Sequence, residues 1–488
     1  MEPQDSHAPT ARLNRRAILV LVLASYLMIV LDISIVITGL PKIRESLGFS
    51  AAGLSWVHTA YTLAFGGLLM AGARAGDLFG RKRMFVTGLA IFVVASALIG
   101  IATSPDMLVA ARALQGLGSA ILAPSTLALL STTFREGPER TRALGLYGAT
   151  AGVGASVGMV LGGVLADLLS WRVGFFINVP IGGLLIWAAL RFVKETPLRT
   201  GRLDLPGAIL STAGMLSLVY GLVEVAELGW TAPQGWLALA ASAVILTLFI
   251  RHEARTAQPL LPLRLFAHRA RAAAYVVRLL FLAGVIGFWF YTTQYLQGVL
   301  GMRPLQAGMA FLPSTIVQFL AALSVPLLTR RFGNERLLAA GIALSALGMA
   351  WLARIGPESN YLTSVALPMM LLGIGQGISL SPMTVTAVAG VSPEDTGAAS
   401  GIVNTAHQLG GSLGLALLVV VFSATAGHAA DARADLAYRV AACLGVGAAL
   451  LVVAFVVVMV YIVRRPAATA PAAPAAPCLL YTSPSPRD

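Results

Sequence analysis

The stretch GLYGATAGVGASVGMVLGG, Gly145 to Gly163, decides how this 488-residue chain folds. It lies in an apolar run over residues 143–168 that is long enough to cross a lipid bilayer as one helix. Seven of its nineteen residues are glycine, and each glycine costs about 1 kcal/mol relative to alanine inside a soluble helix. In lipid, small residues let two backbones approach each other, and the spacing Gly154-x3-Gly158-x3-Gly162 makes such a face. We therefore expect a membrane helix that packs closely on its neighbours.

The rest of the chain has the composition of a polytopic membrane protein. It is 57% hydrophobic and 11% charged, and no stretch long enough for a soluble domain is free of membrane-length apolar runs. Fourteen such runs predict fourteen spanning helices, near residues 17–38, 53–73, 84–103, 106–130, 143–168, 174–193, 207–226, 235–250, 272–294, 305–328, 337–356, 361–390, 399–425 and 437–462.

The positions of Lys and Arg orient these spans. If the N-terminus is cytoplasmic, 24 of the 34 basic residues fall in cytoplasmic segments and 7 in external loops. Basic residues gather on the cytoplasmic side of membrane proteins, so we expect both ends of the chain there. The net charge of +13 is then a result of topology and does not indicate a nucleic-acid partner. Cys443 and Cys478 offer neither a disulfide framework nor metal-ligand spacing.

Two patterns recur at nearly one offset. The loop sequence that begins at Phe79-Gly80 is echoed 253 residues later at Phe332-Gly333, and the ladder that begins at Gly145 is echoed 256 residues later at Gly401. This repetition predicts two six-helix halves with two helices inserted between them. The expected units are a cytoplasmic segment 1–16, an N-terminal half 17–193, an inserted pair 194–271, a C-terminal half 272–462, and a disordered Pro/Ala tail 463–488 whose last eleven residues look artefactual.

The glycine ladder resembles the antiporter motif in the fifth helix of drug:proton exporters of the major facilitator superfamily. The residues that carry the resemblance are Gly145, Gly154, Gly158, Gly162 and Gly163. The family usually has proline where this chain has Met159, so any hinge must come from the glycines. Segments near Trp171 to Pro180, and Leu203 to Gly207, are similar to those of the fourteen-helix branch, although Asp204 is equally explained as a helix cap before Pro206.

The segment Ala73 to Arg83 resembles the loop motif between helices 2 and 3 of the same superfamily. The resemblance implies a conformational latch on the cytoplasmic side, formed by Asp77, Gly80, Arg81 and Lys82. Its physical basis would be a carboxylate near the positive N-terminal end of the helix that begins around residues 397–400, worth about 0.3 to 2 kcal/mol. The alternative is basic charge that serves topology alone.

Asp32 and Arg112 are the two charges placed for proton coupling, in motifs of helices 1 and 4 that resemble those of the exporter branch. Each lies six residues inside the outer end of its helix, about 9 Å deep, so the two can share a level in the bundle. An unpaired charge at that depth is costly, which favours a pair or a water-filled cavity. The alternative is that Arg112 reaches the lipid head groups while Asp32 faces external water.

Other embedded polar residues are candidates for the substrate cavity. Asn404, His407 and Gln408 share one face of helix 13, as cavity lining or as an interhelical hydrogen-bond set. Tyr61 and Gln115, on helices 2 and 4, complete the expected cavity. We further expect that Arg278 extends to the cytoplasmic head groups, and that the aromatic residues from Phe288 to Tyr295 form an interfacial belt.

These features predict an all-α polytopic membrane protein of the major facilitator type with fourteen spans. The resemblance implies proton-coupled export of small, largely apolar drug-like or antibiotic-like compounds across the cytoplasmic membrane, by a protein that is not an enzyme. A facilitator that imports a polar solute and a non-transporting receptor are the alternatives. The expected partners are the substrate, protons and the bilayer, with no cofactor, metal or nucleic acid, and the protein is expected to function as a monomer.

Overall fold

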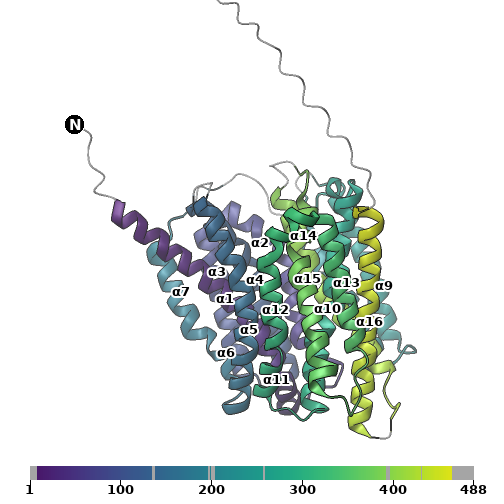
Figure 1. The fold of residues 1–488 in the computed structure, drawn as a ribbon. Helices are drawn as coiled ribbons and strands as arrows, with labels where there is room; N and C mark the ends of the chain where they lie inside the picture. The colour runs from purple at the N-terminus through teal and green to yellow at the C-terminus, as the bar shows by residue number, and fades with distance from the viewer. Residues whose placement is uncertain are drawn as a thin grey trace, which may run out of the picture.

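The computed structural model describes residues 8–134, 138–195, 198, 204–256, 259–391, 396–429 and 431–463. Within these ranges all regular structure is helical and there is no strand. The long helices stand side by side in one bundle (Figure 1). The expected tail beyond residue 463 and the basic residues 199–203 lie outside the described ranges.

The elements before the expected second half begin with α1, which starts at Ala8 and so extends nine residues before the predicted start of the first span. The bounds are α1 (Ala8–Leu47), η1 (Gly53–Ser55), α2 (Trp56–Phe79), α3 (Arg81–Gly100), α4 (Pro105–Thr133), α5 (Pro138–Leu168), α6 (Val173–Phe176), α7 (Asn178–Phe192), α8 (Leu205–Leu228), α9 (Pro233–Glu253) and η2 (Leu263–Phe266). Helix α8 begins at the predicted cap, where the Asp204 side chain accepts a hydrogen bond of 3.0 Å from the Gly207 amide.

The remaining elements repeat the pattern of long antiparallel helices. Their bounds are α10 (Arg269–Gly298), α11 (Pro304–Ala310), α12 (Leu312–Phe332), α13 (Asn334–Leu352), η3 (Tyr361–Ala366), α14 (Leu367–Val388), α15 (Thr396–Ala424), α16 (Ala432–Val458) and η4 (Met459–Val463).

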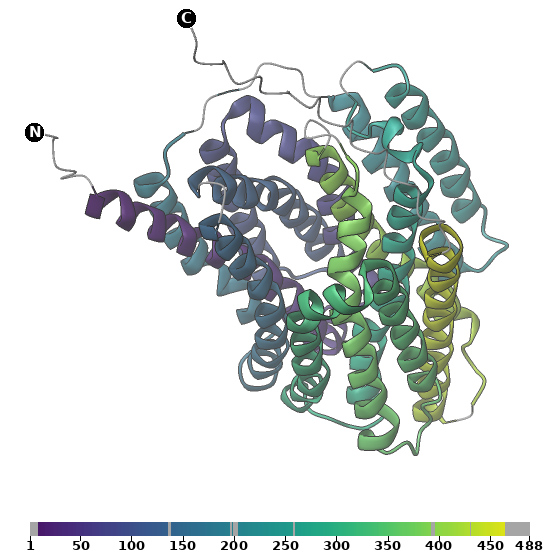
Figure 2. The same ribbon diagram turned by 45° about the horizontal axis from the view of Figure 1, so that its top comes forward.

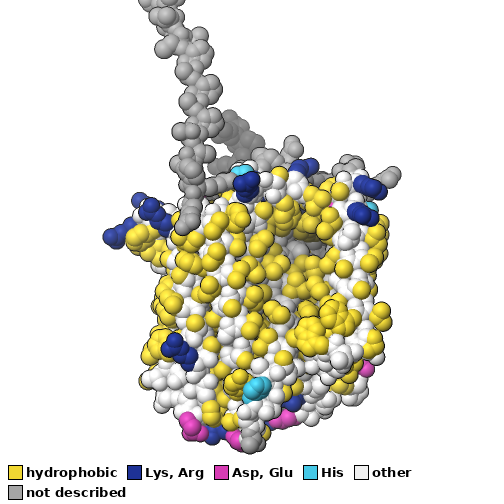
Figure 3. All heavy atoms as spheres, turned by 90° about the vertical axis from the view of Figure 1, so that its right-hand side faces the viewer, with side chains coloured by type: hydrophobic (Ala, Val, Ile, Leu, Met, Phe, Trp, Pro, Cys, Tyr) yellow, Lys and Arg dark blue, Asp and Glu magenta, His cyan; other side chains and the backbone are white. Residues whose placement is uncertain are grey.

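Twelve helices of the described residues are long and apolar enough to cross a membrane. Two long helices stand outside these twelve. The first is α2, whose polar and small residues lower its mean hydropathy. The second is α5, in which the apolar helix within the described side chains is the shorter stretch Ser156–Leu168. Figure 3 shows the consequence on one face of the molecule, where an apolar band separates charged side chains that gather mostly at its two ends.

The helices pack as two related groups. In the first group α1 packs on α5, and α4 packs on both α2 and α3; in the second, α10 packs on α15, and α14 packs on both α12 and α13. The two groups occupy opposite sides of the bundle, with the α8–α9 pair at one edge (Figure 2). Helix α8 contacts both α2 and α15, so the inserted pair packs beside the junction of the groups.

The two loops identified from the sequence repeat have the same conformation. Gly80 ends α2 with φ 101° and ψ 133°, and Gly333 ends α12 with φ 82° and ψ 159°. Residues with a Cβ rarely adopt a positive φ of this size, which explains why glycine stands at both turns. The predicted internal repeat therefore has a structural counterpart at these two helix ends.

Helix α10 lies deeper than the sequence pattern indicated. It contacts α1, α14, α15 and α16, so little of its surface faces lipid. Phe288, Tyr291 and Tyr295 are at most 2% exposed. The predicted interfacial belt is therefore wrong, and these rings form part of the main hydrophobic core.

Candidate functional site

Asp32 on α1 and Arg112 on α4 form an ion pair inside the bundle. The distance from Arg112 Nη1 to Asp32 Oδ2 is 2.6 Å, and both side chains are fully buried. The expected pairing at one level is confirmed. The alternative in which the two charges separate toward head groups and external water does not describe this structure.

Amide side chains from two further elements complete the shell of the carboxylate. Gln115 Nε2 donates to Asp32 Oδ1 over 2.8 Å, and Asn178 Nδ2, at the start of α7, donates to the same oxygen over 3.1 Å. Ser96 on α3 accepts from both amides, over 2.8 and 3.4 Å. Both oxygens of the carboxylate are thus engaged, as a buried charge requires.

The guanidinium of Arg112 has several partners besides Asp32, although its buried Nη2 has none within the described residues. Its Nε donates to the Val57 carbonyl over 2.8 Å, and its Nη1 also donates to the side-chain oxygen of Gln115. Its carbon lies 4.4 Å from the centre of the Tyr61 ring, a cation–π contact, and the Tyr61 hydroxyl bonds Ser119 over 2.9 Å. Tyr61 and Gln115 thus belong to this buried network, and their role in a substrate cavity stays a prediction.

Ser96 and Asn178 are members of the network that the sequence analysis did not assign to the site. Asn178 lies in the segment that resembles the fourteen-helix branch, but this resemblance implies no chemical role for its side chain. The position of Asn178 could have been recognised from the sequence, because an amide side chain inside an apolar run needs a hydrogen-bond partner in the membrane. Ser96 gave no signal, since a serine can bond its own helix, and here its hydroxyl also donates to the Phe92 carbonyl over 2.8 Å.

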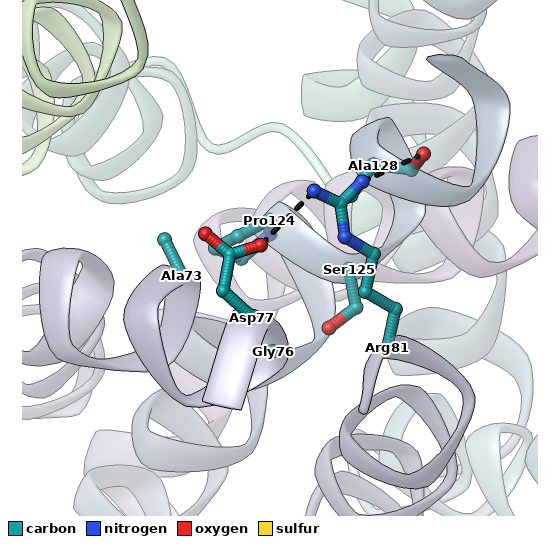
Figure 4. Close-up of a pocket in the computed structure, with 7 residues that line it drawn as sticks. All are labelled: Ala73, Gly76, Asp77, Arg81, Pro124, Ser125 and Ala128. Atoms are coloured by element: carbon teal, nitrogen blue, oxygen red, sulfur yellow. Dashed lines mark hydrogen bonds and ion pairs between the residues drawn. The ribbon is translucent and has the colours of Figure 1, made fainter. Parts of the chain in front are cut away.

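Two residues of the candidate latch, Asp77 and Arg81, line a small pocket between the C-terminal end of α2 and α4 (Figure 4). Asp77 pairs with Arg81 over 3.0 Å, and Arg81 Nη1 donates to the Ala128 carbonyl of α4 over 3.3 Å. Lys82 Nζ donates to the Leu190 carbonyl over 3.0 Å. The loop immediately before α15, residues 392–395, lies outside the described ranges, so the latch between Asp77 and this helix end stays a prediction.

Glu195 is a further residue of this region that sequence reasoning missed. Its two carboxylate oxygens accept hydrogen bonds from the amides of Lys82 and Arg83, over 2.9 and 3.0 Å. A carboxylate at the N-terminus of α3 satisfies unpaired amides and is stabilised by the helix dipole. A Cβ at Gly80 would lie 2.6 Å from the Glu195 carboxyl carbon, so a side chain there would displace this carboxylate, while the positive φ is what favours glycine.

The glycine ladder packs against the first helix of the bundle. A Cβ at Gly154 would lie 2.9 Å from a Leu27 methyl, one at Gly158 would lie 2.6 Å from Ser34 Cβ, and one at Gly162 would lie 2.6 Å from Ile35 Cα. Gly163 faces the second group instead, where its Cβ would lie 2.6 Å from the Pro304 carbonyl of α11. Gly145 lies in α5 at a position whose surroundings are outside the description.

The polar face of α15 is partly open. Asn404 is exposed and donates to the Ser400 carbonyl of its own helix over 3.1 Å, while His407 and Gln408 are half-buried. His407 Nδ1 has no hydrogen-bond partner within the described residues. Neither Asn404 nor His407 thus has an interhelical hydrogen bond among the described residues, and their role in a substrate cavity stays a prediction.

Arg278 departs from its prediction. Its side chain is 8% exposed and lies beneath α14, with Nη1 3.4 Å from the Leu380 carbonyl. The expectation that it extends to the head groups is wrong, because α14 and α15 cover this face of α10.

Two related groups of long helices, the first of which encloses a buried ion pair, make this chain a polytopic membrane protein, and repeated helical groups of this kind are typical of the transporter class. The sequence profile of the Major Facilitator Superfamily matches residues 22–415, and the chain belongs to that superfamily of transporters.

Its relatives include the cephamycin export protein CmcT of Amycolatopsis lactamdurans, 43% identical over 85% of this chain and 86% of that protein. Another is the puromycin resistance protein pur8 of Streptomyces alboniger, 41% identical over 85% of this chain and 83% of that protein. Among solved structures, the nucleoside transporter NupG superimposes with a TM-score of 0.63 at 14% identity, over 91% of this chain and 98% of that one, which shows a shared fold.

Proposed function

We propose that this protein exports small, largely apolar drug-like or antibiotic-like compounds across the cytoplasmic membrane in exchange for protons. Support for the direction and the substrate class comes from relatives above 40% identity that are named for cephamycin export and puromycin resistance. The importer and receptor alternatives have no comparable support.

The single observation that carries the coupling mechanism is the buried Asp32–Arg112 pair. Protonation of Asp32 would remove its charge and break the ion pair. Arg112 would then keep the Val57 carbonyl, Gln115 and the Tyr61 ring, so it would not be left without partners. The Asp32 carboxylate of α1 accepts hydrogen bonds from Asn178 on α7 and from Gln115 on α4. A proton on this carboxylate would therefore change the contacts between three helices at once.

Export by alternating access needs contacts between the halves that break on one side of the membrane at a time. At the outer ends, Asp167 of α5 lies 3.6 Å from Arg303, which precedes α11, and Gln297 of α10 donates to the Thr38 carbonyl of α1 over 3.1 Å. These contacts join the expected N-terminal and C-terminal halves. In the proposed cycle they open to release the substrate, while the latch around Asp77 closes the cytoplasmic side.

The proposal includes fourteen spans with both termini in the cytoplasm, and a monomer that works without a cofactor. Helices α2 and α5 are the two spans added to the twelve apolar ones. They have 24 and 31 residues, more than the roughly 20 that a bilayer requires, and α2 packs on α4 and α15 while α5 packs on α1 and α11.

The test uses inside-out membrane vesicles from a host that lacks its own exporters. With the vesicle interior acidified, radiolabelled puromycin or a cephamycin should accumulate inside, and a protonophore should release it. Accumulation that requires ATP, or that is unaffected by the protonophore, would contradict proton coupling. A lack of accumulation of either compound, with the protein present in the membrane, would contradict the export of this class.

A further inference from the structure

Arg278 is a buried cation without a carboxylate partner among the described residues. It lies nine residues inside α10, about 14 Å along the axis from the helix start, and six residues inside the expected span 272–294. Its Nη1 has only a long contact of 3.4 Å with the Leu380 carbonyl and one of 4.0 Å with Met383 Sδ, and its Nε is buried with no partner. Arg112 also has one buried nitrogen, Nη2, without a partner among the described residues, but unlike Arg278 it is held by a carboxylate, a carbonyl and an amide.

Two groups with aromatic rings, and no described acid, interact electrostatically with this guanidinium. Tyr26 of α1 and His407 of α15 lie close enough to Arg278 to interact with it electrostatically. The Tyr26 ring stacks on the Tyr147 ring of α5, with centres 4.0 Å apart and planes 13° apart. The surroundings of Arg278 thus supply flat apolar surface while its charge stays uncompensated.

The cluster lies where the two halves meet. Tyr26 and Tyr147 belong to α1 and α5, whereas Arg278 and His407 belong to α10 and α15. On α15, the exposed Asn404 lies one turn before the half-buried His407. A buried unpaired arginine in a membrane protein is costly, and such residues commonly mark a site for a substrate or an ion.

We propose that Arg278 is the anion-recognising residue of the substrate site and binds a carboxylate of an amphipathic aromatic compound, whose ring system lies against the Tyr26–Tyr147 stack. This inference rests on the proposed export function and specifies its substrate class as amphipathic monoanions. The planar guanidinium can donate two parallel hydrogen bonds to one carboxylate, which an ammonium group cannot do. The charge of Arg278 would also disfavour dications.

The test compares an acid with its neutral amide. Purified full-length protein in detergent is titrated with 1-pyrenebutyric acid and with 1-pyrenebutyramide, and binding is followed by energy transfer from tryptophan to pyrene. The wild type should bind the acid at least ten-fold more tightly than the amide. In Arg278→Gln the affinities for the acid and the amide should differ by less than two-fold, because affinity for the acid falls while affinity for the amide is retained. Arg278→Lys should show an intermediate preference for the acid. Arg354→Gln, which removes an exposed arginine after α13, should keep the wild-type ratio.

Each result decides the matter. Equal binding of acid and amide by the wild type, or an unchanged ratio in Arg278→Gln, would overturn the inference. If Arg278→Gln does not fold, Arg278→Lys carries the test, and a wild-type ratio there would count against recognition by the planar fork. Proton-driven transport of a cephamycin, which carries a carboxylate, by wild-type vesicles tests the proposed function separately. Such transport together with equal binding of the acid and the amide would contradict only the inference about Arg278.

Discussion

At the scale of single residues, the proposed coupling of transport to protons depends on Asp32. Asn at this position keeps the size and can still accept hydrogen bonds, but it cannot titrate. Asp32→Asn should therefore abolish uphill export driven by a proton gradient while sparing substrate exchange at equilibrium. The measurement is accumulation and counterflow in the same inside-out vesicles. Wild-type uphill export by Asp32→Asn would remove Asp32 from the coupling mechanism.

Arg112→Ala should be more damaging than Asp32→Asn, because it strands a carboxylate at a site with no exposure. Removing one partner of a buried ion pair costs about 3–5 kcal/mol. We expect a lower melting temperature in detergent and the loss of both export and exchange. The double variant Asp32→Asn with Arg112→Ala should regain part of the stability, since no buried charge remains. Arg354→Ala is the matched control, and equal losses in both arginine variants would contradict the role of the pair.

The sequence predicts this site in part. The depths of Asp32 and Arg112 in their helices follow from counting residues, so their pairing could be inferred. The contributions of Ser96 and Asn178 depend on the rotation of α3 and α7 about their axes, which an apolar run with weak periodicity does not fix. The surroundings of Arg278 could not be predicted for a similar reason. Its position along α10 gives no information about which helices cover its side chain.

At the scale of helices, the glycine ladder sets the distance between α5 and α1. A Cβ at Gly162 would lie 2.6 Å from Ile35 Cα and 2.9 Å from the Ile35 carbonyl oxygen, and backbone atoms cannot move aside as a side chain can. Gly162→Ala should therefore destabilise the protein by about 1–3 kcal/mol through overpacking. Gly183→Ala on α7, where a Cβ would meet no atom within 4 Å, is the control and should be neutral. Melting temperatures in detergent compare the two, and equal shifts would refute close packing.

The same ladder in the second half packs in the same way. Gly410 and Gly414 of α15 lie against Leu279 and Ala283 of α10, as Gly158 and Gly162 of α5 lie against α1. The offset between the two ladders predicts equivalent helices. It does not predict that both ladders face the first helix of their half, since small residues favour close approach without choosing a partner.

At the scale of the whole molecule, the number of spans decides which loops face the outside. The test starts from a variant in which both native cysteines are replaced, Cys443→Ser and Cys478→Ser. Single cysteines are then placed at Arg202, which lies outside the described residues, at Thr231 between α8 and α9, and at Arg433 in the first turn of α16. An impermeant thiol reagent on intact cells should label positions 231 and 433 but not 202. Labelling at 202, or its absence at 231 on a folded protein, would show that the inserted pair does not span the membrane as proposed.

The last prediction concerns the motion of the two halves. Asp167 of α5 and Arg303, which precedes α11, form a contact of 3.6 Å at the outer ends of the bundle. Cysteines at both positions, joined by a short bifunctional thiol reagent with a reducible spacer, should hold that side closed. Transport in vesicles should then stop and should return after reduction, because alternating access requires these ends to separate.

The matched control joins two residues that do not move relative to each other. Lys42 and Glu45 form an ion pair of 3.5 Å within α1, so a link between cysteines at these positions spans less than one helical turn. It constrains neither half against the other, and transport should continue. If both links stop transport, the effect comes from modification of the outer surface. If the 167–303 link leaves transport intact, the outer contact does not open during the cycle, and export must proceed by a motion other than the separation of these two ends.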